Sequence, residues 1–150
     1  MTTKRTYPNI KSNQVTQEAR KFSSTTVSRD EEHCLLVIDD DAIVLNALKN
    51  FLKRRVSVVY TAKTSEEARA ILNNYRINIV ICDYDLGTSE VNGVELIRQL
   101  RRQFPKIRRV AIYSGMDTRD IKKTKEIDII CNKPADLQDL CTLVQRPFTD

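Results

Sequence analysis

The chain has 150 residues, of which 41% are apolar and 30% are charged, and its formal net charge is +5. A single domain of this size buries about 68–70% of its unfolded surface, so it needs neither disulfides nor a metal to form a core. The N-terminus lacks the apolar segment of a signal peptide, and no stretch approaches the roughly 18 apolar residues of a membrane span, which predicts a cytoplasmic protein without membrane contact.

The four cysteines show no CxxC spacing, and at least three of them fall inside apolar runs. A thiol in such a run behaves as a small hydrophobic group. We therefore predict that Cys34, Cys82, Cys131 and Cys141 are reduced residues of the core.

The net charge is too evenly spread to diagnose nucleic-acid binding, and nucleic acid is not expected as a partner. Residues 1–33 hold six basic against four acidic residues, and residues 34–150 hold nineteen against sixteen. Two basic clusters are denser, and each is interpreted as a solvated face or as a partner surface. The first consists of Arg98, Arg101, Arg102, Lys106, Arg108 and Arg109. The second consists of Arg119, Lys122, Lys123 and Lys125.

Residues 1–33 are rich in Ser, Thr, Asn and Lys and hold too few apolar side chains to offset the entropy of ordering. We predict an N-terminal tail that is flexible and mostly irregular. Val15, Ala19 and Phe22 recur at the spacing of one helical face, so a short helix is the alternative for this part. The folded domain is expected to span residues 34–150.

From Cys34 onward, strand-like and helix-like segments alternate. Leu35–Ile38 is an apolar run that predicts a strand buried on both faces, and three consecutive aspartates follow it. Asp40 or Asp41 is suited to cap the next helix. The inner face expected for that helix consists of Val44, Ala47, Leu48 and Phe51.

The second and third strands are predicted at residues 56–60 and at Ile79–Cys82. The second alternates apolar and polar residues and contains Ser57, which is typical of a partly exposed strand. Between these strands, Thr64–Glu67 is a capping box that opens a helix. The third strand is apolar throughout and ends at Asp83.

The C-terminal half continues the alternation. Asn92 is expected to cap a helix that Pro105 ends. Strands are expected at residues 110–113 and 127–131, and Asp128 interrupts the second of them. Residues 117–126 predict a short, weakly held fourth helix, because Ile121 is its only large apolar residue. A final helix with an apolar stripe over residues 137–144 is expected to be capped by Asp136.

Five strand and helix units in sequence predict an α/β fold with a five-stranded parallel sheet that is doubly wound and flavodoxin-like. The polar residues Ser57 and Asp128 suggest that the second and fifth strands are at the edges, which gives the order 2-1-3-4-5. The switch point then lies between the first and third strands. Asp39, Asp40 and Asp83 all lie at this point, where ligands bind in open parallel sheets.

Converging carboxylates repel one another unless a cation lies between them. Oxygen ligands alone favour Mg²⁺, which commonly binds one or two carboxylates and a phosphate oxygen. Ser114 follows the fourth strand and would add a hydroxyl group, and Lys133 follows the fifth and would add a positive charge. Together these groups predict a phosphoryl-transfer site with Asp83 as the nucleophile.

Residues 34–145 resemble the receiver domain of two-component response regulators. The motifs that carry the resemblance are Ile38-Asp39-Asp40, Asp83, Ser114-Gly115 and Lys133-Pro134. The resemblance implies that Asp83 accepts a phosphoryl group from a sensor histidine kinase or a histidine phosphotransfer protein. It also implies Mg²⁺ held by Asp39, Asp40, Asp83 and the main-chain carbonyl of Asp85, with phosphoryl contacts from Ser114 and Lys133. A cis Lys133–Pro134 bond would fit, because proline permits it at little cost.

Two departures from the family pattern concern signalling output. Ile130 stands where the family usually has an aromatic switch residue, and the predicted fourth helix is polar and basic. We expect output through contact with another protein, whose identity the sequence does not give, with phosphorylation shifting the arrangement of the fourth helix. A homodimer through the face between the fourth and fifth helices is one alternative for that contact.

Two other functions remain open. A receiver-like module could bind or scaffold its partners without being phosphorylated. Alternatively, Asp83-Tyr84-Asp85 resembles the nucleophile and acid pair of haloacid-dehalogenase-type phosphatases, in which Asp85 would protonate the leaving group. Against the phosphatase, the acid pair at Asp39 and Asp40 precedes Asp83, and no inserted cap is present to enclose a substrate.

Overall fold

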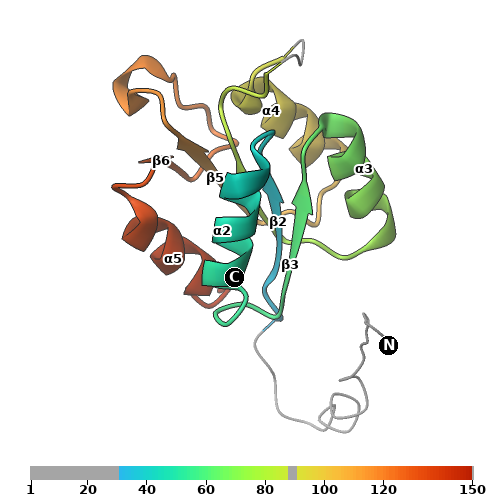
Figure 1. The fold of residues 1–150 in the computed structure, drawn as a ribbon. Helices are drawn as coiled ribbons and strands as arrows, with labels where there is room; N and C mark the ends of the chain where they lie inside the picture. Colours follow the sequence, from blue (N-terminus) through green and yellow to red (C-terminus); the bar gives the residue numbers. More distant parts are fainter. Residues whose placement is uncertain (1–30, 88–90, 150) are drawn as a thin grey trace, which may run out of the picture. The chain divides into compact units, whose positions relative to one another are not determined.

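The computed structural model describes residues 31–87 and 91–149 (Figure 1). The short helix predicted over Val15, Ala19 and Phe22 lies outside these residues. Glu32–Asp150 forms a compact unit. Within the described part of the chain, no helix combines the length and the apolar character needed to cross a membrane.

Five parallel strands form the sheet, in the order β3-β2-β4-β5-β6. The strands are β2 (Cys34–Ile38), β3 (Val58–Ala62), β4 (Ile79–Cys82), β5 (Arg109–Ser114) and β6 (Ile129–Asn132). This order confirms the predicted topology, although the reason given for the edges was wrong. Ser57 and Asp128 precede β3 and β6 instead of interrupting them. Asp128 pairs with the neighbouring strand through its Oδ2, which accepts a hydrogen bond from the main-chain N–H of Val110 at 2.8 Å.

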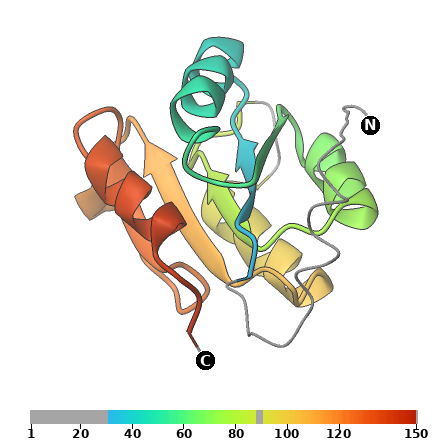
Figure 2. The ribbon, with the colours of Figure 1, turned by 90° about the horizontal axis from the view of Figure 1, so that it is seen from below.

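Helices cover both faces of the sheet, as Figures 1 and 2 show. One face carries α2 (Ala42–Leu52) and α5 (Leu137–Gln145), and the other carries α3 (Ser65–Asn74) and α4 (Gly93–Gln103). Residues of β2 alternate between the two resulting clusters, with Leu35 and Val37 in the first and Leu36 and Ile38 in the second. The apolar run is therefore buried on both faces because each face has its own helices. All four cysteines are free and buried, as predicted.

The inner face of α2 differs in part from the predicted one. Leu45, Leu48 and Leu52 are buried. Of the other predicted residues, Val44 and Phe51 are half-buried and pack on the same core cluster, whereas Ala47 is exposed. The stripes that start at residues 44 and 45 both have helical spacing and share Leu48, so periodicity alone does not choose between them. Packing against β2 and β3 buries the stripe of three leucines most deeply.

Three of the four predicted helix caps are present. The Asp41 side chain caps α2 by accepting a hydrogen bond from the Ile43 N–H at 2.9 Å. The Thr64 side chain accepts a hydrogen bond from the Glu67 N–H, and the Asn92 side chain caps α4 in the same way. Asp136 occupies the N-cap position of α5 but makes no capping bond. Its Oδ2 instead accepts from the N–H of Asn132 at 2.9 Å, so it fixes the turn between β6 and α5.

The predicted helix over residues 117–126 is absent, and only a 3-10 turn, Thr118–Asp120, takes its place. Asp117 accepts hydrogen bonds from the Arg119 main chain at 2.9 Å and from its guanidinium at 2.7 Å. Ile121 is buried against the side of the sheet that α3 and α4 cover. A single buried residue cannot supply the continuous apolar stripe that stabilises a surface helix, which explains why the segment stays irregular.

One arginine of the first basic cluster, Arg109, is buried and stabilises the fold. Arg109 is only 7% exposed, and its guanidinium donates to the carbonyl oxygens of Leu143 at 2.9 Å, Pro147 at 2.6 Å and Arg146. It also lies 4.2 Å from the centroid of the Phe148 ring. Arg109 therefore fastens the carboxyl end of α5, where the helix dipole favours a positive charge.

Replacing Arg109 with methionine is expected to lower the free energy of unfolding by about 3 kcal/mol, because three carbonyl groups lose a charged donor. Urea unfolding followed by circular dichroism measures the change. Arg102→Met is the matched control, because Arg102 belongs to the same basic cluster and its side chain is exposed. That control should stay within about 0.5 kcal/mol of wild type. Equal stability of the two variants would contradict the role given to Arg109.

Candidate functional site

Main-chain hydrogen bonds between neighbouring strands fix the backbone of the candidate site. Asp39 follows β2 and donates its N–H to the last residue of β3 at 3.0 Å, while Asp83 follows β4 and donates to Ile38 at 2.9 Å. Lys133 follows β6 and donates to the carbonyl of Ser114 at 2.8 Å. Each of these residues therefore sits at the carboxyl end of a strand, as predicted.

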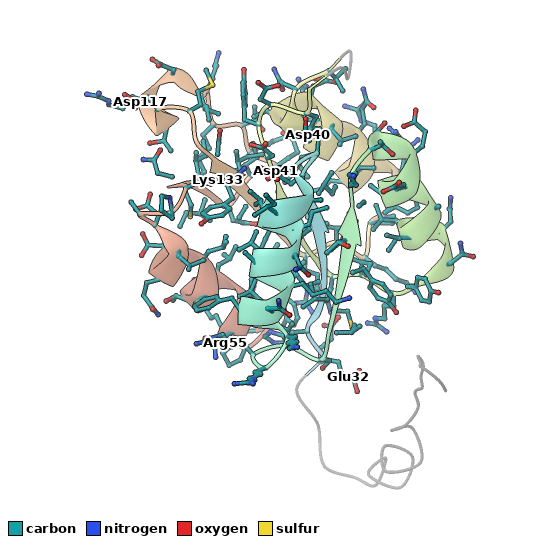
Figure 3. All side chains as sticks on the ribbon, in the orientation of Figure 1. Glu32, Asp40, Asp41, Arg55, Asp117 and Lys133 are labelled. Atoms are coloured by element: carbon teal, nitrogen blue, oxygen red, sulfur yellow. The ribbon has the colours of Figure 1, made fainter. Side chains whose placement is uncertain are left out.

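Three carboxylates and one ammonium group meet at this edge of the sheet. One carboxylate oxygen each from Asp39, Asp40 and Asp83 lies within 4.8 Å of the others. The Lys133 Nζ lies 2.6 Å from an Asp39 oxygen and 3.4 Å from an Asp83 oxygen. The Lys133–Pro134 bond is cis, as the resemblance implied. Figure 3 labels Asp40 and Lys133, which lie near the end of the sheet at which α2 begins.

The charges of the site are not balanced. Burial and the nearby Asp39 carboxylate raise the pKa of Asp83 to about 6, although Lys133 acts in the opposite direction. Burial tends to lower the pKa of Lys133, but its hydrogen bond to Asp39 and the charges of both aspartates raise it overall. A single ammonium group shared by two buried carboxylates cannot neutralise both, and its shorter contact is with Asp39.

The donor set fits a hard divalent cation. The three side chains offer only carboxylate oxygens, which Mg²⁺ prefers over the nitrogen and sulfur ligands typical of Zn²⁺. Asp39 is 2% and Asp83 is 9% exposed, while Asp40 is exposed, so the cluster opens to solvent on one side. The uncompensated negative charge and the opening together make this cluster the candidate metal site.

The two further predicted residues come from the carboxyl ends of β4 and β5, which are neighbours in the sheet. Ser114 ends β5 and is 1% exposed, and its Oγ accepts a hydrogen bond from the Met116 N–H at 3.1 Å. Asp85 is exposed, and its Oδ1 accepts from the N–H of Gly87 at 3.0 Å. The Asp85 side chain thus shapes the loop after β4, and only its main chain is left for the role that the resemblance implied. Ile130 is half-buried and packs on the cluster beneath α3 and α4.

The sequence analysis missed the role of Gly93, the first residue of α4. Its N–H donates to the carbonyl of Tyr84 at 2.7 Å. A Cβ atom at this position would lie 2.0 Å from the main-chain oxygen of Asp83. The available signal was a glycine directly after the cap of an otherwise strongly amphipathic helix, where glycine weakens the helix.

Comparison with known proteins agrees with this geometry. A sequence model described as the response regulator receiver domain matches residues 35–145. The hydrogenase transcriptional regulatory protein HoxA of Cupriavidus necator is 30% identical over 92 residues, which are 61% of this chain and 18% of HoxA. The aerobic respiration control protein ArcA of Escherichia coli is 35% identical over 69 residues, 46% of this chain and 28% of ArcA. This chain thus spans less than a third of the length of these curated relatives.

Solved structures give the same fold. A response regulator from Thermotoga maritima is 26% identical, with a TM-score of 0.63 over 77% of this chain and 100% of its own. A receiver protein from Pseudomonas putida is 28% identical, with a TM-score of 0.62 over 79% and 98%. A response regulator from Burkholderia pseudomallei, solved with a phosphorylated aspartic acid and a calcium ion, is 25% identical, with a TM-score of 0.65 over 76% and 67%.

The matched region contains the sheet apart from Cys34, and it contains all the residues of the acidic cluster together with Lys133. The chain therefore belongs to the response regulator receiver domain family.

Proposed function

We propose that this protein is a phosphoacceptor of two-component signalling, in which Asp83 takes a phosphoryl group from a sensor histidine kinase or a histidine phosphotransfer protein in a Mg²⁺-dependent reaction. The observation that carries the proposal is the convergence of the Asp39, Asp40 and Asp83 carboxylates within 4.8 Å, with Lys133 in contact with two of them. A cytoplasmic location is part of the proposal.

In this reaction, a carboxylate oxygen of Asp83 attacks phosphorus while the bond from phosphorus to the donor's imidazole nitrogen breaks. Asp39, Asp40, Asp83 and the main-chain carbonyl of Asp85 would hold the Mg²⁺. When bound, Mg²⁺ would supply positive charge that reduces the repulsion between the carboxylates and the incoming phosphoryl oxygens. Lys133 would contribute its ammonium charge, and the Ser114 hydroxyl group is the proposed hydrogen-bond donor to the phosphoryl group.

The phosphorylated aspartic acid in the Burkholderia pseudomallei response regulator supports the assignment of Asp83. A dehalogenase-type phosphatase would use the Asp85 carboxyl group as its acid. Here the Asp85 carboxylate accepts a hydrogen bond from the Gly87 main chain instead. This contact favours the phosphoacceptor over the phosphatase.

We propose that output occurs by contact with another protein. The homodimer considered from the sequence used a face between the predicted fourth and fifth helices. The fourth of these, predicted over residues 117–126, is absent, so the proposal does not rest on that face. Arg98 pairs with Glu95 and Glu126, and Arg101 pairs with Asp128. With Arg109 buried as well, the first basic cluster offers less free charge for nucleic acid than its sequence suggested.

The test is intact-mass measurement after incubation with acetyl phosphate. In Mg²⁺ we expect the mass of one phosphoryl group per chain, and with excess EDTA we expect none. No increment under either condition would overturn the proposal and favour a scaffold that acts without phosphorylation. Repeated release of phosphate from small phosphate esters would favour the phosphatase.

A further inference from the structure

The loop after β4 passes close to one of the acidic side chains of the site. Gly87, four residues beyond Asp83, has a positive φ of 71°. A Cβ atom built on Gly87 would lie 2.5 Å from Oδ2 of Asp40 and 3.5 Å from its Cγ. Carbon and oxygen atoms that are not bonded do not approach to such a distance. The Asp40 carboxylate therefore occupies the space that the side chain of any other residue at position 87 would need.

Local contacts hold the loop in this shape. The N–H of Gly87 donates to Oδ1 of Asp85 at 3.0 Å, an Asx turn that stabilises the reversal of the chain. Asp40, in contrast, is exposed at the start of α2. If a side chain were added at position 87, the exposed carboxylate would move more easily than the hydrogen-bonded loop.

We infer that Gly87 is a positioning residue for the metal site, because its missing side chain lets the Asp40 carboxylate lie where it can share one cation with Asp39 and Asp83. The inference rests on the proposed function in one respect, namely that the carboxylate cluster binds Mg²⁺. Gly87 has no side chain that could bind the cation or the phosphoryl group, so it would act only through Asp40.

The expected effect is a weaker cation site. Mg²⁺ demands nearly ideal octahedral geometry and tolerates displaced ligands poorly. Changes to residues that orient a metal ligand commonly reduce metal affinity about 10-fold to 100-fold. We expect Gly87→Ala to weaken Mg²⁺ binding by about 10-fold.

The experiment measures Mg²⁺ affinity without any phosphoryl donor, from the rise of the thermal unfolding midpoint as Mg²⁺ is added to metal-free protein. Gly87→Asn is the second variant, because asparagine adopts a positive φ more readily than alanine but still carries a Cβ atom. Both variants should lose affinity if the Cβ atom is the cause. Gly115→Ala is the matched control, since a Cβ atom there meets nothing within 4 Å, and it should bind Mg²⁺ like wild type.

A double-mutant cycle separates action through Asp40 from a general disturbance of the loop. In an Asp40→Ala background, Gly87→Ala should cause no further loss of Mg²⁺ affinity, because the carboxylate that it displaces is gone. An equal loss in both backgrounds, or wild-type affinity in Gly87→Ala, would overturn the inference and leave the proposed function intact. Wild-type protein that binds no Mg²⁺ would overturn the metal-dependent function, and the inference with it.

Discussion

Asp83→Asn is expected to abolish phosphoryl uptake from acetyl phosphate and, in metal-free protein at pH 7, to raise the free energy of unfolding. Uptake is lost because the amide of asparagine has no anionic oxygen to attack phosphorus. Intact-mass measurement in Mg²⁺ should show no increment for the variant under conditions that modify wild type. A full increment on the variant would mean that another residue accepts the phosphoryl group.

The gain in stability follows from the pKa of Asp83, which burial and the Asp39 charge raise from 3.8 to about 6. Between these values the native state binds more protons than the unfolded state, so wild-type stability falls as the pH rises from about 4 to about 6. Above pH 6 the ionised carboxylate therefore costs stability, on the order of 2 kcal/mol once solvent screening is allowed for. Asparagine has nearly the same shape and carries no charge, so it removes this cost.

Thermal unfolding in EDTA at pH 4 and pH 7 provides the control. The variant should exceed wild type at pH 7 and approach it at pH 4, where the Asp83 carboxyl group is protonated in the native state. Saturating Mg²⁺ at pH 7 should reduce the difference, because the cation binds the native wild type and stabilises it. A variant that is less stable than wild type in EDTA at both pH values would contradict this account of the electrostatics.

Gly93→Ala is expected to lower the free energy of unfolding by about 3 kcal/mol, at the upper end for overpacking a tight site. The new Cβ atom would lie 2.0 Å from the Asp83 main-chain oxygen and 2.9 Å from its carbonyl carbon. The Asp83 main chain cannot rotate away from the new atom as a side chain could, so α4 or the loop that contains Asp83 must shift. Chemical denaturation measures the stability, and the rate of acetyl phosphate labelling should fall because Asp83 is displaced.

The direction of this change separates steric conflict from helix propensity. Alanine favours a helix over glycine by about 1 kcal/mol, so propensity alone would make the variant more stable. Gly115→Ala adds a methyl group in open space after β5 and should leave stability nearly unchanged. Should Gly93→Ala match or exceed the stability of wild type, the close approach of α4 to Asp83 would be disproved.

Structural features that depend on residues close together in the chain could be predicted from the sequence. The apolar run before Asp83 predicted a strand buried on both faces, and the alternation of strands and helices predicted a parallel sheet. The predicted strand order was correct, although Ser57 and Asp128, on which it was based, precede the edge strands. Since parallel strands end at one edge, the positions of Asp39, Asp83 and Lys133 followed from the topology. That convergence is why most of the candidate site could be found without coordinates.

Errors arose where two local patterns competed. The α2 sequence fits two overlapping stripes, and only packing decides that Leu45 and Leu52 face the sheet. Aspartate is a common N-cap residue, yet the Asp136 carboxylate accepts a hydrogen bond from the Asn132 N–H across a turn. Residues 117–126 have enough polar helix formers to suggest a helix, but their single buried apolar residue, Ile121, does not stabilise one.

Strand ends, core composition and the chemistry of the acidic cluster were thus readable from residue types and their spacing. The roles of Gly87, Gly93 and Arg109 were settled only by tertiary contacts. Each depends on a gap or a hydrogen bond between atoms whose separation is set by the packing of whole helices and loops. Such distances cannot be predicted directly from the amino-acid sequence, because they result from the simultaneous packing of many side chains.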